Sequence, residues 1–217
     1  MIAQSEIDGL CAPHGLTVSG VLAACAGDGF APALQSIVLI SPDEPRFWPL
    51  FQASTEAGDD GQDPLDRWSK RVIGTIAVAL GGVAVFPSDG PPYHPFQQWA
   101  GRSGRAFVSP VGLLVHETAG LFISYRGAIA LPDRVDQPAL PAAPPCEGCA
   151  RPCVSACPVG ALTDTGYDVT ACKSYLDLPT GADCQTGGCL VRRACPVGQD
   201  RRAAAQSAFH MRAFHPV

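Results

Sequence analysis

A repeated cysteine pattern in the last third of the chain constrains its fold more than any other feature. A first set comprises Cys146, Cys149, Cys153 and Cys157; a second comprises Cys184, Cys189 and Cys195; Cys172 lies alone between them. Each set closes with the same pentapeptide, Ala-Cys-Pro-Val-Gly, at 156–160 and 194–198. A cysteine followed by proline, after several cysteines at turn-like spacings, is typical of a chain that wraps a cubane iron–sulfur cluster. With four thiolates per cluster, the pattern predicts two [4Fe–4S] clusters.

Two other uses of clustered cysteines remain as alternatives. A disulfide framework belongs to secreted proteins, and the N-terminal residues do not combine a basic start, an apolar run and a small-residue cleavage site. Zinc also binds Cys-x2-Cys, but a four-cysteine zinc site usually uses two such knuckles. This chain has one, at Cys146 and Cys149. Cys11 and Cys25 lie far from the array and are interpreted as small apolar residues.

The charge distribution excludes some classes of partner. The formal net charge is −5, and residues 1–145 carry 8 Lys and Arg against 14 Asp and Glu. Nucleic-acid binding requires a basic surface, so we expect no DNA partner. The apolar stretch 72–86 contains three glycines and is too short to span a bilayer, so we expect no membrane partner. We predict a cytoplasmic location, where thiols stay reduced and clustered cysteines favour metal binding.

A proline-rich segment divides the chain. Residues 131–145 contain five prolines and no apolar periodicity, which is typical of an extended, semi-rigid connector. We therefore predict an α+β protein in which a mixed α/β domain (1–131) and a small ferredoxin-like module (146–217) are joined by a linker (132–145).

Apolar spacing and turn residues predict the elements of each part. Upstream, we expect helices at 4–14, from Asp63-Pro64 onwards and at 95–100, and strands at 17–23, 36–40 and 83–86. Two β-rich runs, 111–116 and 121–131, flank a short Gly-containing loop and predict a hairpin. Downstream, we expect a short helical turn before each Cys-Pro, a helix at 169–176 that carries Cys172, and a C-terminal helix at 199–214.

Four arginines follow or end the second cysteine set: Arg192, Arg193, Arg201 and Arg202. They form a solvated helix face, or they offset the negative charge of thiolate-bound clusters and raise the cluster potential. Both roles are compatible.

The cysteine region resembles the epoxyqueuosine reductase family. The resemblance is carried by Cys146-x2-Cys-x3-Cys-x3-Cys157-Pro, by Ala171-Cys-Lys-Ser-Tyr-Leu176 around the lone cysteine, and by the final Cys-Pro set. That family joins a cobalamin-dependent reductase domain to a two-[4Fe–4S] ferredoxin-like domain. Residues 112–132 look like the hairpin of CblC-type cobalamin-processing proteins. Both families share a flavin-nitroreductase-like architecture, so the resemblance implies a nitroreductase- or cobalamin-processing-like N-terminal domain, with cobalamin as a further cofactor.

The resemblance also implies roles for individual residues. By the crossed ligation of two-cluster ferredoxins, one cluster would be held by Cys146, Cys149, Cys153 and Cys195, and the other by Cys157, Cys172, Cys184 and Cys189. His116 matches a histidine near the corrin, Arg126 matches the arginine of the same motif, and Asp89 is the candidate catalytic acid. From the residues alone, His116 is equally a hydrogen-bonded residue at a strand end, and Asp89 in a Pro/Gly-rich loop favours a turn role.

Two functions from different classes follow. In the first, the chain is a reductase whose clusters pass electrons to a corrinoid-type cofactor or substrate on the N-terminal domain. In the second, it is a ferredoxin-like electron carrier whose N-terminal domain only docks a partner. Either function requires a redox partner protein. No dinucleotide fingerprint, P-loop or nucleophile elbow is present in the sequence.

Overall fold

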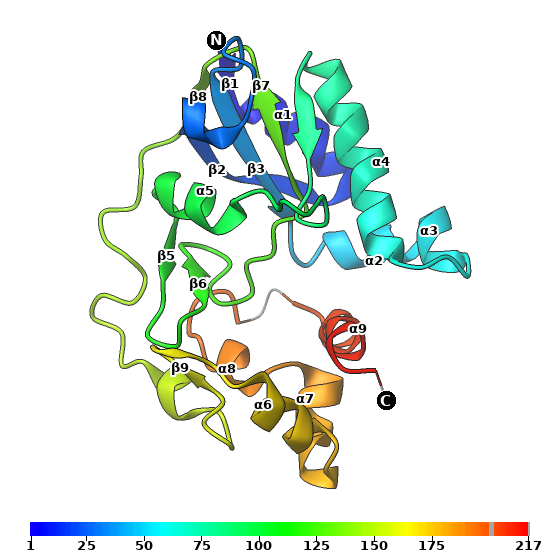
Figure 1. Ribbon diagram of the computed structural model, residues 1–217, viewed down its shortest axis with the longest axis vertical. Helices are drawn as coiled ribbons and strands as arrows, with labels where there is room; N and C mark the ends of the chain where they lie inside the picture. Colours follow the sequence, from blue (N-terminus) through cyan, green and yellow to red (C-terminus); the bar gives the residue numbers. More distant parts are fainter. Residues whose placement is uncertain (200–201, 217) are drawn as a thin grey trace. The chain divides into compact units, whose positions relative to one another are not determined.

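The computed structural model describes residues 1–199 and 202–216. The chain divides into two compact units, each built from two segments (Figure 1). Unit 1 comprises Met1–Arg105 and Ser124–Leu140, and unit 2 comprises Ala106–Ile123 and Pro141–Val217. We expected a first domain made of the continuous stretch 1–131 and a module that begins at 146. In the structure the segment 106–123 instead belongs with the cysteine-rich residues, because its apolar side chains are buried among them.

Unit 1 is built on a four-stranded antiparallel sheet. Its strand order is β2 (Leu16–Ala23), β3 (Ser36–Pro42), β7 (Gly127–Leu131) and β4 (Val83–Val85). Every residue of β7 and all but the last of β3 are buried. Continuous burial in an apolar strand means that both faces of the sheet are covered. A parallel pair, β1 (Ile2–Ala3) and β8 (Val135–Asp136), lies outside this sheet.

Unit 1 has five α-helices: α1 (Gln4–Cys11), α2 (Phe47–Gln52), α3 (Thr55–Gly58), α4 (Pro64–Ala79) and α5 (Phe96–Arg102), of which α1, α4 and α5 contact the sheet. Short 3-10 turns occur at Ala12–His14 and Ala26–Asp28. The amphipathic spacing of α4 directs Leu65, Trp68, Val72, Ile73 and Ile76 inward, and this helix packs against β4 and β7.

Close contacts at two glycines place α4 and α5 on opposite faces of the sheet. A Cβ on Gly20 would lie 2.8 Å from the side chain of the first residue after α5, whereas a Cβ on Gly127 would lie 3.0 Å from Cδ1 of Ile73 in α4. Leu39 pairs with both Gly20 and Ala128. Because successive residues of a strand face opposite ways, Gly127 faces away from the side that Gly20 and Ala128 share.

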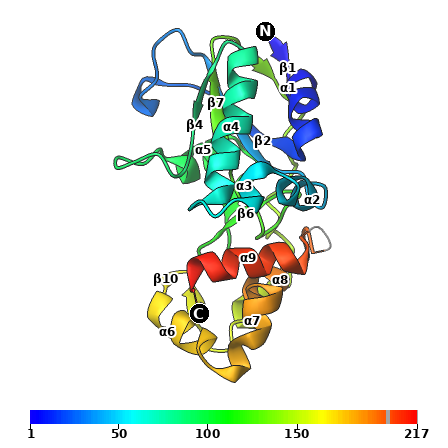
Figure 2. The ribbon, with the colours of Figure 1, turned by 90° about the vertical axis from the view of Figure 1, so that its right-hand side faces the viewer.

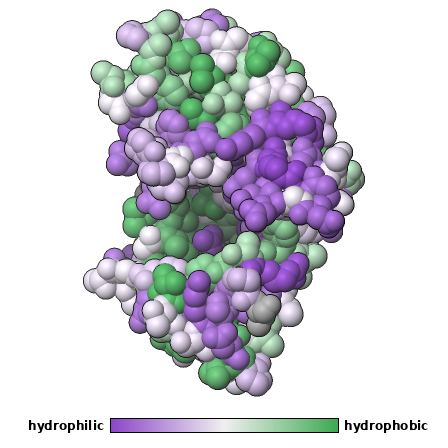
Figure 3. All heavy atoms as spheres, turned by 45° about the vertical axis from the view of Figure 1, so that its right-hand side comes forward, coloured by the Kyte–Doolittle hydropathy of each residue, from purple (hydrophilic) through white to green (hydrophobic). Residues whose placement is uncertain are grey.

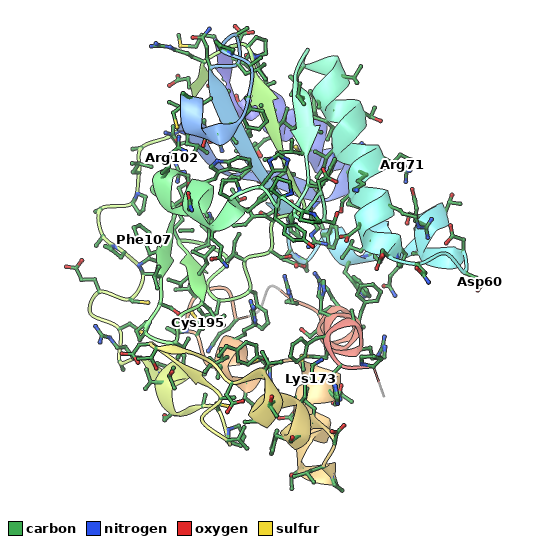
Figure 4. All side chains as sticks on the ribbon, viewed as in Figure 1. Asp60, Arg71, Arg102, Phe107, Lys173 and Cys195 are labelled. Atoms are coloured by element: carbon green, nitrogen blue, oxygen red, sulfur yellow. The ribbon has the colours of Figure 1, made fainter. Side chains whose placement is uncertain are left out.

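A buried carboxylate ties the Ala26–Asp28 turn to α5. Asp28 is 6% exposed and accepts hydrogen bonds from Nε1 of Trp99 at 2.8 Å, from Nη2 of Arg102 at 3.2 Å and from the backbone N–H of Cys25 at 2.8 Å. Arg102, labelled in Figure 4, also donates to the carbonyl oxygen of Ala23. A buried charge with this many partners is stabilising only while its network is intact.

Polar residues gather over α3 and the start of α4, where the surface view shows a hydrophilic area (Figure 3). Arg71 donates to Glu56 at 2.5 and 2.9 Å, and Arg67 donates to Asp59 at 2.8 Å. Figure 4 labels Arg71 on α4 and Asp60 in the loop between α3 and α4. These ion pairs join α3 and the loop after it to α4.

Unit 2 contains short elements around the cysteines. Its strands form two antiparallel pairs, β5 (Ala106–Val108) with β6 (Leu114–His116), and β9 (Leu162–Thr163) with β10 (Gly166–Tyr167). Its helices are α6 (Val169–Leu176), α7 (Ala182–Gly187), α8 (Leu190–Arg193) and α9 (Ala204–Phe214), with 3-10 turns η3 (Pro152–Ser155) and η4 (Pro179–Gly181). Helix α9 packs along α7 (Figure 2).

The expected hairpin between 111–116 and 121–131 is wrong. β6 pairs instead with β5, and β7 lies between β3 and β4 in the sheet of unit 1. Only an isolated bridge joins His116 to Gly120. The apolar residues of β7 are completely buried between two strands, and a two-stranded hairpin offers no such burial. Most other expected elements occur; α6 has the expected ends, and α9 begins at Ala204, while residues 200–201 of the helix expected at 199–214 lie outside the described residues. Within the described residues, no helix combines the length and apolarity needed to cross a membrane.

Candidate metal centre

Four cysteines line one pocket in unit 2. Three come from the first set and one from the second: Cys146, Cys149, Cys153 and Cys195. Val115 and Leu121, from the segment 106–123, line the same pocket. Figure 4 labels Cys195, which lies beside the loop that follows β6. The chain thus brings sulfur atoms from both cysteine sets to one apolar hollow.

The local fold explains how the two sets meet. Cys153 lies in η3, which ends two residues before Cys157, and α8 ends two residues before Cys195. The expectation that a helical turn precedes each Cys-Pro is therefore met. η3 and α8 pack against each other, and Cys153 and Cys195 are both buried, at 7% and 6% exposed. The packing of η3 against α8 therefore brings the first cysteine set close to the end of the second.

The sulfur atoms of this pocket influence one another electrostatically. Burial raises the pKa of the Cys146 thiol, and the charges of Cys149, Cys153 and Cys195 raise it further, while Arg151 acts in the opposite direction. Burial also raises the pKa of Cys153, with additional contributions from Cys195 and Cys149. Thiolates gathered in this way repel one another unless a cation neutralises them, as an iron–sulfur cluster does.

The other four cysteines are also neighbours. Burial raises the pKa of Cys172, and the charges of Cys189 and Cys157 add to this effect while a hydrogen bond from Tyr167 opposes it. Burial raises the pKa of Cys184, and Cys189 again contributes. Cys172 is carried by α6 and Cys184 by α7, and the two helices are in contact. Cys157, Cys172, Cys184 and Cys189 therefore form a second neighbourhood of sulfur atoms.

Backbone amides already point at sulfur in both sets. The N–H of Arg151 donates to Sγ of Cys149 at 3.3 Å, and the N–H of Ala161 donates to Sγ of Cys157 at 3.3 Å. Hydrogen bonds to the sulfurs are among the features that set cluster potentials. Within residues 1–199 and 202–216, no three His, Cys, Asp or Glu side chains are grouped closely enough to hold a single metal ion. A cubane differs in this respect, since its thiolates bind separate irons.

An apolar cluster encloses the first pocket, and the sequence did not reveal its source. Val111, Val115 and Leu121 come from the 106–123 segment and pack with Leu162 and Val191 of the cysteine-rich part. All five are buried. The sequence did show that 111–121 is rich in apolar residues, but we interpreted them as part of a hairpin with the residues that follow. The segment supplies an apolar wall that the cysteine-rich residues lack.

His116 lies in unit 2, at the end of β6, and is 4% exposed. Its Nδ1 accepts hydrogen bonds from the backbone N–H groups of Thr118 and Ala119, at 3.2 and 3.4 Å. Nδ1 is therefore an acceptor, which shapes the turn that follows the strand. This is the role of a hydrogen-bonded residue at a strand end, and the contact with a corrin stays a prediction.

Asp89 and Arg126 both lie in unit 1. Oδ2 of Asp89 accepts the N–H of Phe86 at 3.0 Å, and Oδ1 lies 2.8 Å from Nζ of Lys70. These are the contacts of a turn residue, and a catalytic role stays a prediction. The side chain of Arg126 is 15% exposed, and Nη1 lies 3.8 Å from Asp66. Burial lowers the pKa of Arg126, while Asp66 raises it.

Two of the four arginines near the second set hold the 106–123 segment. Nη1 of Arg192 donates to the carbonyl oxygen of Leu121. Nη2 of Arg202 donates to the carbonyl oxygen of Phe122 at 2.8 Å, and its guanidinium lies 5.1 Å from the ring of Phe122. Arg193 pairs with Asp183 across the surface, and Arg201 lies outside the described residues.

Comparison with known proteins supports the architecture. No family model and no curated protein matches the sequence. Among solved structures, the chain is similar to a selenomethionine-labelled epoxyqueuosine reductase, with a TM-score of 0.55 and 16% sequence identity. The match covers 91% of this chain and 66% of that one. At this identity the likeness concerns the fold, and this α+β chain shares its fold with the greater part of an epoxyqueuosine reductase.

Proposed function

We propose that this chain is an iron–sulfur reductase that binds two [4Fe–4S] clusters and delivers electrons to a corrinoid-type cofactor or substrate held by unit 1. The observation that carries the proposal is the pocket lined by Cys146, Cys149, Cys153 and Cys195. A ligand set drawn from both cysteine sets is the arrangement of two-cluster ferredoxins, in which each Cys-Pro serves the other set's cluster.

The residues present fit such a cluster. The donor set consists of four sulfurs, the enclosing side chains are apolar, and a backbone N–H already donates to Sγ of Cys149. The second neighbourhood, formed by Cys157, Cys172, Cys184 and Cys189, would hold the other cluster. The clusters, when bound, supply one-electron transfer; the chain supplies the thiolates, the amide donors and the apolar wall that limits access of water.

Unit 1 offers donors that a corrinoid could use. The hydroxyl of Tyr125 and Nε of Arg126 are buried, and neither has a hydrogen-bond partner. Buried donors without partners are costly, and two in adjacent residues suit a ligand rich in amide oxygens, such as the side chains of a corrin. We propose Arg126 as a corrin contact and Asp89 as a candidate catalytic acid, as the resemblance to the cobalamin-dependent families implies. His116, for which the resemblance also implies a corrin contact, lies in unit 2 and is hydrogen-bonded within its own turn.

Metal analysis tests the cluster half of the proposal. Anaerobically prepared protein should contain about eight irons and about eight acid-labile sulfides per chain, from two cubanes. Stoichiometric zinc, or four or fewer irons, would contradict it. Protein in which the exposed Cys25 is replaced by Ser is the matched control, because a cysteine outside both sets should leave the iron content unchanged.

Titration with cobalamin tests the corrinoid half. The iron-loaded protein should bind added cobalamin, detected by the change in its visible spectrum, and Arg126→Gln should weaken binding. The control is Arg134→Gln, whose side chain makes a long exposed contact with Gln35 at 3.4 Å. If the wild-type protein binds two clusters and no cobalamin, the reductase proposal fails and the electron-carrier function replaces it.

A further inference from the structure

The two Ala-Cys-Pro-Val-Gly segments have the same sequence but differ in what lies against them. Gly160 and Gly198 close the two segments, and both have a left-handed backbone, with φ +61 and +72. No described atom lies within 4 Å of the position that a Cβ would take on Gly160, whereas a Cβ on Gly198 would lie 2.9 Å from the carbonyl group of Ala119. Cys157 is half-buried and Cys195 is 6% exposed. The second Cys-Pro turn is therefore covered by the turn that follows β6.

The covering turn, residues 116–120, is closed by its own backbone. The N–H of His116 donates to the carbonyl oxygen of Gly120, and the N–H of Gly120 donates to the carbonyl oxygen of His116, both at 3.0 Å. A Cβ on Gly120 would lie 3.1 Å from Sγ of Cys195. The shape of this turn therefore decides how closely the backbone approaches the sulfur.

The imidazole of His116 stabilises this shape from inside the turn. Its Nδ1 accepts the N–H groups of Thr118 at 3.2 Å and of Ala119 at 3.4 Å, and the hydroxyl of Thr118 lies 3.1 Å from the same nitrogen. The side chain is 4% exposed. If Nδ1 were removed, both N–H groups would lose this acceptor, which is unfavourable beside a buried residue. The turn would then change its shape to satisfy them.

We infer that His116 is a positioning residue for the ligand Cys195. By shaping the turn 116–120, it keeps backbone against the second Cys-Pro turn and water away from Sγ of Cys195. The inference rests on the proposed two-cluster function, and it gives His116 a role that requires no corrin. Reduction adds one negative charge to a cluster, and access of water stabilises that charge and raises the potential. The turn therefore holds down the potential of the cluster that Cys195 serves.

Potentiometric titration of the iron-loaded protein, followed by electron paramagnetic resonance, tests the inference. His116→Leu keeps a side chain of similar size and removes the acceptor. We expect it to raise one of the two midpoint potentials, by up to about tenfold in the one-electron equilibrium constant, and a tenfold change is about 59 mV. The cluster with the raised midpoint should be the one that is lost in Cys195→Ala. The other midpoint should not move.

Two further variants separate the acceptor from the ring and from the fold. His116→Asn should keep both midpoints near their wild-type values, because its amide oxygen can accept hydrogen bonds in place of Nδ1. Gly198→Ala leaves His116 intact and presses on Ala119 from the other side, so it should raise the same midpoint as His116→Leu. Its matched control is Gly160→Ala in the first segment, where a Cβ has space, and that midpoint should not move.

The outcomes distinguish the inference from the proposed function. In protein that contains about eight irons, the inference is overturned if His116→Leu leaves both midpoints unchanged, or if His116→Asn shifts them as much as His116→Leu does. The two-cluster function then stands. If His116→Leu does not fold, a comparison of Gly198→Ala with Gly160→Ala decides, and equal midpoints in these two variants overturn the inference. If iron and sulfide analysis of the wild type shows no pair of cubanes, the proposed function fails, and the inference fails with it.

Discussion

A Cβ atom on Gly120 would lie 2.0 Å from the carbonyl oxygen of Val197. It would also lie 3.1 Å from Sγ of Cys195. The turn after β6 thus lies directly against the Cys-Pro turn that ends the second cysteine set. Gly120 has φ +56, so it has two reasons to be glycine: a left-handed backbone and the absence of space for a side chain. This close approach holds the segment 106–123, which supplies the apolar wall of the pocket, next to Cys195.

Replacing Gly120 with alanine should destabilise unit 2 and lower its iron content. Gly160→Ala is the matched control, because Gly160 has φ +61 and nothing lies within 4 Å of the position that a Cβ would take there. Both changes incur the left-handed strain of about 1 kcal/mol. Only Gly120→Ala adds a clash with backbone, of about 1–3 kcal/mol. Anaerobic unfolding in denaturant, together with iron analysis, measures the difference. If both variants lose the same stability and the same amount of iron, the contact between Gly120 and Val197 is not tight.

Double variants should reveal whether ligation is crossed. Cys195→Ala alone should remove about half of the iron, since one of two clusters loses a ligand. If Cys195 serves the cluster of Cys146, adding Cys146→Ala should cost little more iron, whereas adding Cys189→Ala should remove the second cluster as well. The reverse result, in which Cys195→Ala and Cys189→Ala together remove no more iron than either alone, would place both residues on the same cluster.

Replacing Asp28 with asparagine should lower the stability of unit 1 by about 2 kcal/mol, because it leaves Arg102 without its charged partner. Asp43→Asn is the control, since the Asp43–Arg46 pair is exposed and such pairs contribute about 0.5 kcal/mol. Thermal unfolding followed by circular dichroism measures both.

The effect of Asp28 should not change with pH in the neutral range. Burial acts to raise the pKa of Asp28, but hydrogen bonds from Arg102, the N–H of Cys25 and Trp99 outweigh it and hold the pKa well below its ordinary value. A lowered folded-state pKa contributes stability that is complete above the unfolded pKa of about 3.9, and that is lost as the pH falls through the folded value. The difference between wild type and Asp28→Asn should therefore be constant from about pH 5 to pH 8. A difference that shrinks within this range would contradict the assignment.

Short-range patterns predicted several elements closely. The helix expected at 169–176 is α6, with the same ends, and the helix expected from Asp63-Pro64 begins at Pro64. Asp63 does not cap it with its side chain and instead has φ 48, in the left-handed region. Periodicity and proline position are local properties, so they could locate these helices, whereas the geometry of a cap depends on the loop that leads into it.

The sequence by itself was enough to suggest the cluster chemistry proposed for unit 2, because cysteine spacing and the repeated Cys-Pro are local features that can be recognised without the fold. Only the tertiary structure decided which segments share a unit. The run 106–131 contains two apolar, β-rich stretches, at 111–115 and 121–131, and β-rich residues do not encode their partners. Burial between β3 and β4 takes 127–131 into the sheet of unit 1, and packing of Val111, Val115 and Leu121 takes the preceding residues to the cysteines. The free energy of burying apolar surface depends on surfaces that come together only in the folded chain.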